Sequence, residues 1–145
     1  MKAIAIFAAA ALLAACAQAH PDAAAAAPSS AANSQAEGLN GNWRVSHVNG
    51  KNLAAGQGTL WLDAAQGRYA LNLGCNNLFG TFTLPKGGLV FGPAASTLKM
   101  CEPEAMQLDR DAAAALAQTR GYRRQGQQLE LIDADGKPVL AAVAE

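Results

Sequence analysis

The stretch LNLGCNNLFGTF, residues 71–82, interrupts a strand-like alternation with Gly74, Cys75, Asn76 and Asn77. On either side of this interruption apolar and polar residues alternate, which is typical of β-strands with one buried face. Glycine and asparagine tolerate positive φ, so these residues suit a bulge or sharp bend at which the strand changes direction. We therefore predict that Asn76 shapes the backbone of a bend. Contact of Asn76 with a ligand is the alternative.

Alternation of the same kind extends over most of the chain from residue 39 onward. Short turns rich in glycine, proline, asparagine and aspartate separate the segments, so successive strands should be antiparallel neighbours. His47 is expected on the same strand face as Trp43 and Val45. The expected strands lie near residues 43–47, 60–62, 68–73, 78–84, 89–91, 122–124, 129–131 and 139–143.

One helix should interrupt this pattern after residue 102. Pro103 suits a first helical position, and Glu102 and Glu104 place negative charge at the positive end of the helix dipole. Apolar residues then recur at spacings of three or four and form a narrow stripe of Ala105, Leu108, Ala112, Ala115 and Leu116. Arg120 and Gly121 are expected to close the helix. The predicted fold class is α+β but mostly β: a strongly bent antiparallel sheet or partial barrel with one α-helix inserted before the last hairpin.

The N-terminus predicts export and a lipid anchor. Met1 and Lys2 give a basic start, and the apolar run that follows at residues 3–13 is too short for a membrane-spanning helix, which needs about 20 residues. The sequence Leu-Ala-Ala-Cys, ending at Cys16, resembles the bacterial lipobox, in which the cysteine becomes the lipidated N-terminus. An ordinary signal peptide, with Cys16 lost or incidental, is the alternative. Ala17 favours the outer membrane, because aspartate at this position favours retention in the inner membrane.

The chain is therefore expected to have three parts. Residues 1–15 form the lipoprotein signal peptide, residues 16–38 the lipidated cysteine with a disordered Ala/Ser/Pro tether, and residues 39–145 the folded domain. Loss of Lys2 with the signal peptide leaves 10 of the 11 basic residues against 11 acidic ones. This near-neutral balance gives no support for nucleic-acid binding.

Cys75 could be a nucleophile, a metal ligand or half of a disulfide. A catalytic thiol usually needs a histidine base, and the one histidine of the predicted domain, His47, is better explained as a hydrogen-bonded structural residue. A structural zinc site needs about four close Cys or His ligands, which this domain lacks. The carboxylates Asp63, Asp109 and Asp111 form no recognisable catalytic motif. We therefore expect no catalytic, metal or cofactor site and no enzyme activity.

The disulfide is the best explanation of Cys75. With Cys16 assigned to the lipid, Cys75 and Cys101 remain as an even pair in an exported domain. The bridge would tie the bend to the start of the helix, because Cys101 immediately precedes Glu102 and Pro103. A pair of buried free thiols is the alternative.

At these residues the sequence resembles the META domain family, also called HslJ-like, of bacterial envelope proteins. The likeness covers about residues 40–143, including the closing sequence GYRRQGQQLEL at residues 121–131. Leu98 and Asn72 depart from the family pattern, in which a basic residue and a glycine are common at these positions. The matching motif residues are Trp43, Gly74, Cys75, Asn76, Gly80, Thr97 and Cys101.

The resemblance implies a small β-rich module of the bacterial envelope, of a kind associated with heat or antibiotic stress and without established catalytic activity. We expect a protein held by Cys16 in the outer membrane, facing the periplasm, that acts by binding an envelope protein or a small ligand. The alternative is a lipid-anchored inhibitor or ligand-binding module directed at an envelope hydrolase. Residues 92–95, Gly-Pro-Ala-Ala, are the nearest candidate for an inhibitory loop, although they could equally be a connector.

Overall fold

The computed structural model describes residues 38–145. The predicted signal peptide, the predicted lipidation site Cys16 and nearly all of the predicted tether lie outside these residues. Among the described helices, none is long and apolar enough to cross a membrane.

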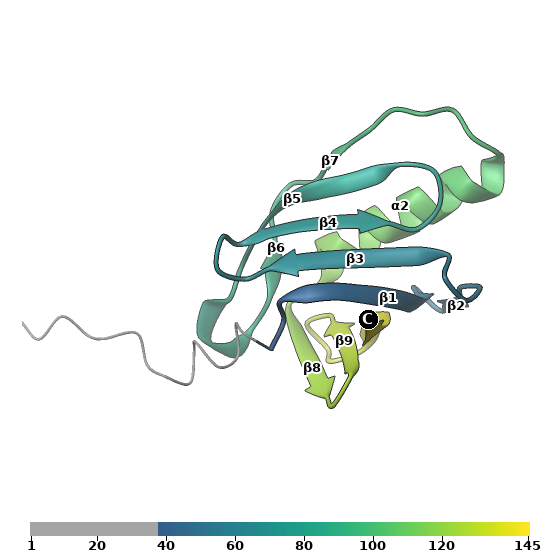
Figure 1. Ribbon diagram of the computed structural model, residues 1–145. Coiled ribbons are helices and arrows are strands. Elements are labelled where there is room, and N and C mark those ends of the chain that lie inside the picture. The colour runs from purple at the N-terminus through teal and green to yellow at the C-terminus, as the bar shows by residue number, and fades with distance from the viewer. Residues whose placement is uncertain (1–37) are drawn as a thin grey trace, which may run out of the picture.

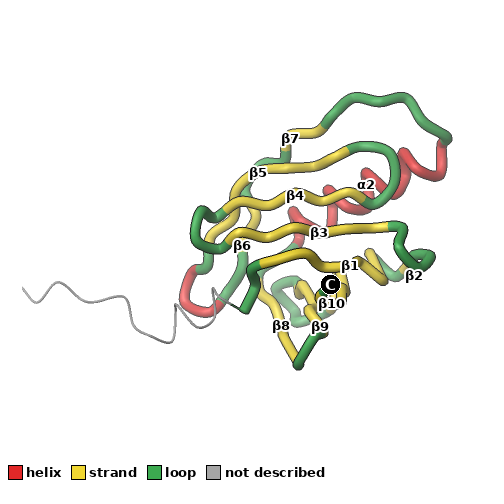
Figure 2. Tube along the Cα trace, viewed as in Figure 1, coloured by secondary structure: helices red, strands yellow, loops and turns green. Residues whose placement is uncertain are grey.

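The described chain is a bent antiparallel sheet that curls into a nearly closed barrel, with one helix packed against its inner face (Figures 1 and 2). The sheet order is β6-β5-β4-β3-β1-β10-β9-β8, with β2 paired to β1 and β7 paired to β5. One hydrogen bond links the two ends of this order, because the Leu89 N–H donates to the Arg120 carbonyl at 3.2 Å. The elements are β1 (Gly41–Val48), β2 (Lys51–Asn52), β3 (Gly58–Asp63), β4 (Arg68–Asn72), β5 (Asn77–Thr83), the 3-10 helix η1 (Pro85–Gly87), β6 (Val90–Phe91), β7 (Ala95–Ser96), α2 (Pro103–Gln118), β8 (Gly121–Gln125), β9 (Gln128–Ile132) and β10 (Pro138–Ala144). The predicted fold class is confirmed.

In most of the longer segments every second side chain is buried, which explains why they form strands with one face in the core. In β3, Leu60 and Leu62 are buried, whereas Thr59 and Trp61 between them are exposed, as expected for a strand with one face in the core. The helix α2 adds Ala112, Ala115 and Leu116 to the same core, and its small alanines allow close approach to the sheet. The other large buried side chains include Trp43, Tyr69, Leu71, Leu129, Leu131 and Leu140.

Two details of the sequence prediction are wrong. His47 does not share the core face of Trp43, because the β1–β10 register shifts between Val45 and His47 and this bulge buries Val48 instead. His47 is half-buried, and its Nδ1 lies 3.1 Å from Oδ1 of Asn52.

The end of the helix also differs from the prediction. The helix ends at Gln118, and Thr119 follows in an extended conformation. The Arg120 guanidinium donates to the carbonyls of Ala117 and Thr119, so it caps the helix with its side chain. Gly121 is the first residue of β8, where an added Cβ would meet the Ile132 side chain at 3.3 Å.

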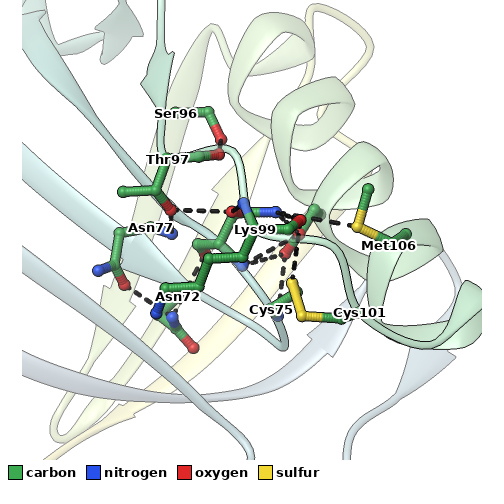
Figure 3. The surroundings of a disulfide bond; sticks show 10 residues. Asn72, Cys75, Asn77, Ser96, Thr97, Lys99, Cys101 and Met106 are labelled. Atoms are coloured by element: carbon green, nitrogen blue, oxygen red, sulfur yellow. Dashed lines mark hydrogen bonds between the residues drawn. A yellow bond between two sulfur atoms is a disulfide. The ribbon is translucent and has the colours of Figure 1, made fainter.

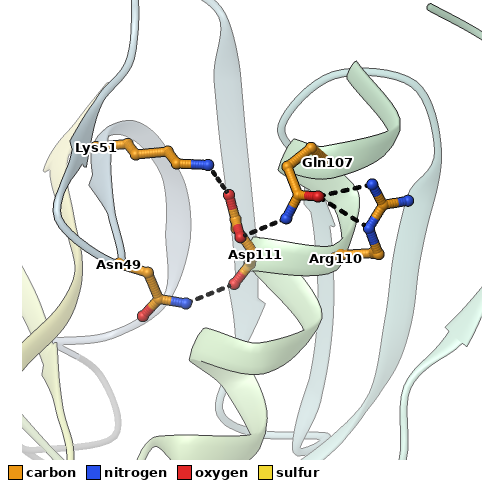
Figure 4. Close-up of polar contacts among 5 residues, drawn as sticks. All are labelled: Asn49, Lys51, Gln107, Arg110 and Asp111. Carbon is orange, nitrogen blue, oxygen red and sulfur yellow. Dashed lines mark hydrogen bonds and ion pairs between the residues drawn. The ribbon is translucent and has the colours of Figure 1, made fainter. Parts of the chain in front are cut away.

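Polar contacts fix α2 to the turn between β1 and β2 (Figure 4). The Lys51 ammonium and the Asp111 carboxylate form an ion pair at 2.6 Å, and the Asn49 amide donates to the Asp111 carbonyl at 3.0 Å. Gln107 donates to the other carboxylate oxygen of Asp111 at 3.0 Å. Asp111 is therefore structural, and its carboxylate orients the helix against β1.

Replacing Asp111 with asparagine should lower the free energy of unfolding by about 0.5–1 kcal/mol at neutral pH, because Lys51, which is half-exposed, loses its charged partner. The hydrogen bond from Lys51 is the main factor that holds the pKa of Asp111 below its usual value. A lowered carboxyl pKa stabilises the fold above the unfolded pKa of about 3.9, and this stabilisation is lost as the pH falls through the folded pKa.

Urea denaturation at neutral pH and at about pH 2 tests this prediction. The difference between the natural protein and Asp111→Asn should be present at neutral pH and absent in acid. An equal difference at both pH values would contradict the charge-based explanation.

Candidate functional site

The bend between β4 and β5 is organised around Asn76, a polar side chain that is only 4% exposed. Its Oδ1 accepts a hydrogen bond from the Thr97 hydroxyl at 2.9 Å and another from the Lys99 N–H at 2.7 Å. Its Nδ2 donates to the Lys99 carbonyl at 3.4 Å (Figure 3). Asn76 thus fastens residues 97–99 to the bend, and its predicted structural role agrees with these contacts.

Asp109, from the second turn of α2, binds the other side of this bend. Its carboxylate accepts the Asn76 N–H at 3.1 Å, the Asn76 Nδ2 at 2.9 Å and the Cys75 N–H at 3.3 Å. Hydrogen bonds to a charged acceptor are the stronger kind, so this contact is a main attachment of the helix to the sheet. No local pattern in the sequence indicates this role of Asp109.

The predicted disulfide between Cys75 and Cys101 is present, with a Cα–Cα distance of 6.0 Å. It joins the bend to the residue two positions before α2. Cys75 therefore carries no free thiol, and the structure offers no nucleophile at this position. Within residues 38–145, no group of three His, Cys, Asp or Glu side chains is placed to hold a metal ion.

The two motif glycines make room for neighbours. A Cβ at Gly74 would lie 3.2 Å from the Ala105 carbonyl oxygen, so the absence of a side chain lets the first turn of α2 approach the bend. A Cβ at Gly80 would lie 2.9 Å from the Pro93 carbonyl and 3.1 Å from the Tyr69 ring. The Tyr69 hydroxyl is buried there and has no hydrogen-bond partner among residues 38–145, and burial raises the pKa of Tyr69.

The segment from Thr97 to Cys101 links β7 to the start of α2 outside any strand or helix, and its alternate residues are anchored. Thr97 pairs with Asn77 through both its hydroxyl and its backbone N–H, Lys99 is held by Asn76, and Cys101 is held by the disulfide. The residues between these anchors, Leu98 and Met100, are 95% and 92% exposed. We call residues 97–101 the anchored loop.

An apolar groove of about 330 Å³ lies beside the anchored loop, between residues 94–100 and α2. Asn76, Asp109 and Arg110 supply polar groups to its lining. The apolar part of the lining consists of Leu78, Ala94, Leu98, Met100, Met106 and Ala113. The groove and the two exposed side chains together form the candidate binding site.

The remaining predicted motif residues have structural positions. Trp43 is buried, donates from Nε1 to the Leu39 carbonyl at 2.9 Å, and has the Arg124 guanidinium 5.6 Å from its ring centroid. Residues 92–95 lead from β6 into β7, and the Gly92 N–H donates to the Thr81 carbonyl at 2.8 Å. This segment is therefore a connector, and the exposed loop lies a few residues further on.

Sequence reasoning missed Leu98 and Met100 as surface residues. The usable signal was their place between Thr97 and the helix start, where two large apolar residues alternate with the charged Lys99 outside any predicted strand or helix. Such alternation is typical of a segment with one face attached to the fold, and the attached residues are Thr97, Lys99 and Cys101.

Comparisons with known proteins agree with this architecture. The family model described as META domain matches residues 36–145. An NMR structure of a protein from Burkholderia xenovorans is 25% identical, with a TM-score of 0.60, and the match covers 87% of this chain and 97% of that chain. A crystal structure of a DUF4847 family protein from Bacteroides vulgatus is 12% identical, with a TM-score of 0.56, over 74% of this chain and 94% of that chain, and this likeness shows the fold alone. Among the curated proteins, none matches this sequence.

Proposed function

Because the chain belongs to the META domain family, we propose that it is a non-catalytic, lipid-anchored protein of the bacterial cell envelope that acts by binding a protein partner. The resemblance of residues 13–16 to a lipobox supports anchoring through Cys16, and Ala17 supports the outer membrane, with the domain facing the periplasm. The family resemblance supports an association with heat or antibiotic stress.

The anchored loop is the observation that carries the binding function. Leu98 and Met100 are almost fully exposed although each is large and apolar, and both adjoin an apolar groove. Adjacent exposed apolar groups of this kind mark interaction sites. Because the residues on either side of each are already fixed, a partner would bind them without a large loss of loop entropy.

A protein partner fits this site better than a small ligand does. Leu98 and Met100 project into solvent, so an occupant must have a concave or adaptable apolar surface that covers them. Lys99 and Arg110 beside them supply polar contacts at the rim. Burying one such aliphatic side chain contributes about 1.5–3 kcal/mol.

The same loop supports an inhibitor of an envelope hydrolase as the second candidate function. A segment with alternate side chains projecting and the residues between them held in place is suited to insertion into the cleft of another protein. The disulfide next to this segment limits its opening. Residues 92–95 do not have this geometry, so the inhibitory role is proposed for the anchored loop.

Photo-crosslinking in the producing cell tests the proposal with the full chain. A photoreactive amino acid at Met100 should give adducts of defined mass, whereas the same group at Asp135, an exposed position in the β9–β10 turn, should not. Adding Leu98→Asp to the chain that carries the photoreactive group at position 100 should reduce the adduct yield about tenfold, because the apolar contact is lost. The fold should be unaffected, since Leu98 is 95% exposed.

The identity of the adduct decides between the two functions. A hydrolase whose activity falls in the presence of this chain assigns the inhibitor role, and any other envelope protein assigns the general binding role. Equal adduct yields at Met100 and Asp135, or no effect of Leu98→Asp, would overturn the proposed site.

A further inference from the structure

A second surface, made of residues that do not line the groove, lies on the outer face of strands β3, β4 and β5. Strand register places Trp61 opposite Ala70 and Ala70 opposite Phe79, so the three residues form one row across the sheet. Trp61 is 40% exposed and Phe79 is 46% exposed, which makes them the two exposed aromatic side chains among residues 38–145. We call this row the aromatic row.

Hydrogen-bonding side chains border the aromatic row on both sides. Residues two positions along a strand share its face, so the neighbouring outward rows can be taken directly from the register. One bordering row consists of Thr59, Asn72 and Asn77, and the other of Asp63, Arg68 and Thr81. Asn72 donates from Nδ2 to Asn77 Oδ1 at 2.7 Å, which orients both amides along the surface.

The aromatic row has the shape of a platform. Neighbouring strands are 4.7–4.9 Å apart, so Trp61 and Phe79, two strands apart, are separated by about 10 Å. Ala70 between them has the smallest side chain after glycine, so it adds little bulk between the two rings. The helix α2 lies behind β3, β4 and β5 in Figure 1 and packs into the core on their inner face, so it does not cover the platform.

We propose that this outer face binds a glycan chain, with sugar rings stacked on Trp61 and Phe79. Sugar rings present flat C–H faces that stack on aromatic rings, and hydroxyl groups at their edges that pair with amides, carboxylates and guanidinium groups. The platform offers both kinds of group in adjacent rows. A ring over Ala70 and its neighbours along the chain would place hydroxyls beside Asn72 and Arg68.

The composition of the surface favours a glycan over other partners. A protein partner of an apolar patch would need contiguous apolar surface, whereas here polar rows lie immediately on both sides of the aromatic row. A nucleic acid would need a basic surface, whereas Arg68 and Asp63 lie opposite each other and the chain is near neutral. The glycan surface does not depend on the proposed function of the anchored loop, since the two share no residue.

Intrinsic fluorescence of the full chain tests this assignment. The chain has two tryptophans, and Trp43 is buried, so a change on adding ligand reports on Trp61. We expect a saturable change with a β-1,4-linked N-acetylglucosamine tetramer or with cellotetraose as the probe. Tighter binding of the N-acetylglucosamine tetramer would indicate that Asn72 and Asn77 contact its acetamido groups. Equal binding of the two tetramers would indicate that recognition rests on ring stacking alone.

Matched variants make the test specific. Trp61→Ala and Phe79→Ala, measured by calorimetry, should each weaken binding about tenfold, and Trp61→Tyr should retain most of it. Ala70→Leu should also weaken binding because its larger side chain adds bulk between the two rings while leaving both in place. Leu98→Ala, in the separate groove, should leave the affinity unchanged. Absence of binding by both tetramers, or undiminished binding by Trp61→Ala and Phe79→Ala, would overturn the proposal.

Discussion

Replacing both Cys75 and Cys101 with alanine should lower the free energy of unfolding by about 3.5 kcal/mol. The disulfide closes a loop between residues that are 26 positions apart. Without it the unfolded chain regains conformational entropy, and for a loop of this length that gain corresponds to about 3.5 kcal/mol. The loss is a large part of the typical 5–15 kcal/mol of a small domain. The fold should survive, because Asn76 and Asp109 still join the bend to the anchored loop and to α2.

Urea denaturation at neutral pH measures this loss. Reduction of the natural protein should give a similar value, since both treatments open the same loop. Met100→Ala is the matched control, because it changes the neighbouring residue, which is 92% exposed, and should leave stability within about 0.5 kcal/mol. A loss below about 1 kcal/mol in the double alanine variant would mean that the unfolded chain is already restricted there or that the hydrogen bonds alone set the stability.

The barrel strands were predictable from the sequence because their burial is one-sided. Leu60 and Leu62 alternate with solvent-facing residues, and such a pattern is incompatible with a helix at the same positions. The disulfide was predictable by counting, since Cys75 and Cys101 are the only cysteines left in the predicted domain once Cys16 is set aside. The strands follow from local periodicity and the disulfide follows from the number of cysteines. Neither inference requires knowledge of which distant residues are in contact.

The contacts of the site were not predictable in the same way. Asp109 lies 33 residues after Asn76, and nothing in the local pattern of the helix distinguishes its carboxylate from a solvated one. The usable signal was the combination of two predictions: a disulfide at Cys101 brings the start of the helix, and hence Asp109, to the bend. The bulge at His47 has no comparable signal, because one extra residue reverses the alternation after it without changing composition.

The second large effect is expected for Asn76→Ala. The substitution leaves the Thr97 hydroxyl and the Lys99 N–H without their acceptor and removes one donor from Asp109. Asn76 is 4% exposed, so water cannot easily replace it, and each buried unpaired group costs about 1–3 kcal/mol. We expect a loss of about 3 kcal/mol in the free energy of unfolding, measured by urea denaturation.

Asn72→Ala is the matched control, because Asn72 precedes the same bend but is half-buried and should cost less than about 1 kcal/mol. A double-mutant cycle of Asn76→Ala with Asp109→Asn should give a coupling energy of about 1–3 kcal/mol, since the two side chains are in direct contact. The Lys99 amide should also exchange its hydrogen faster, because its acceptor is gone. If exchange at Lys99 is unchanged, Asn76 does not hold the anchored loop. If it accelerates and crosslinking from the photoreactive group at position 100 falls although Leu98 is intact, loop rigidity itself contributes to binding.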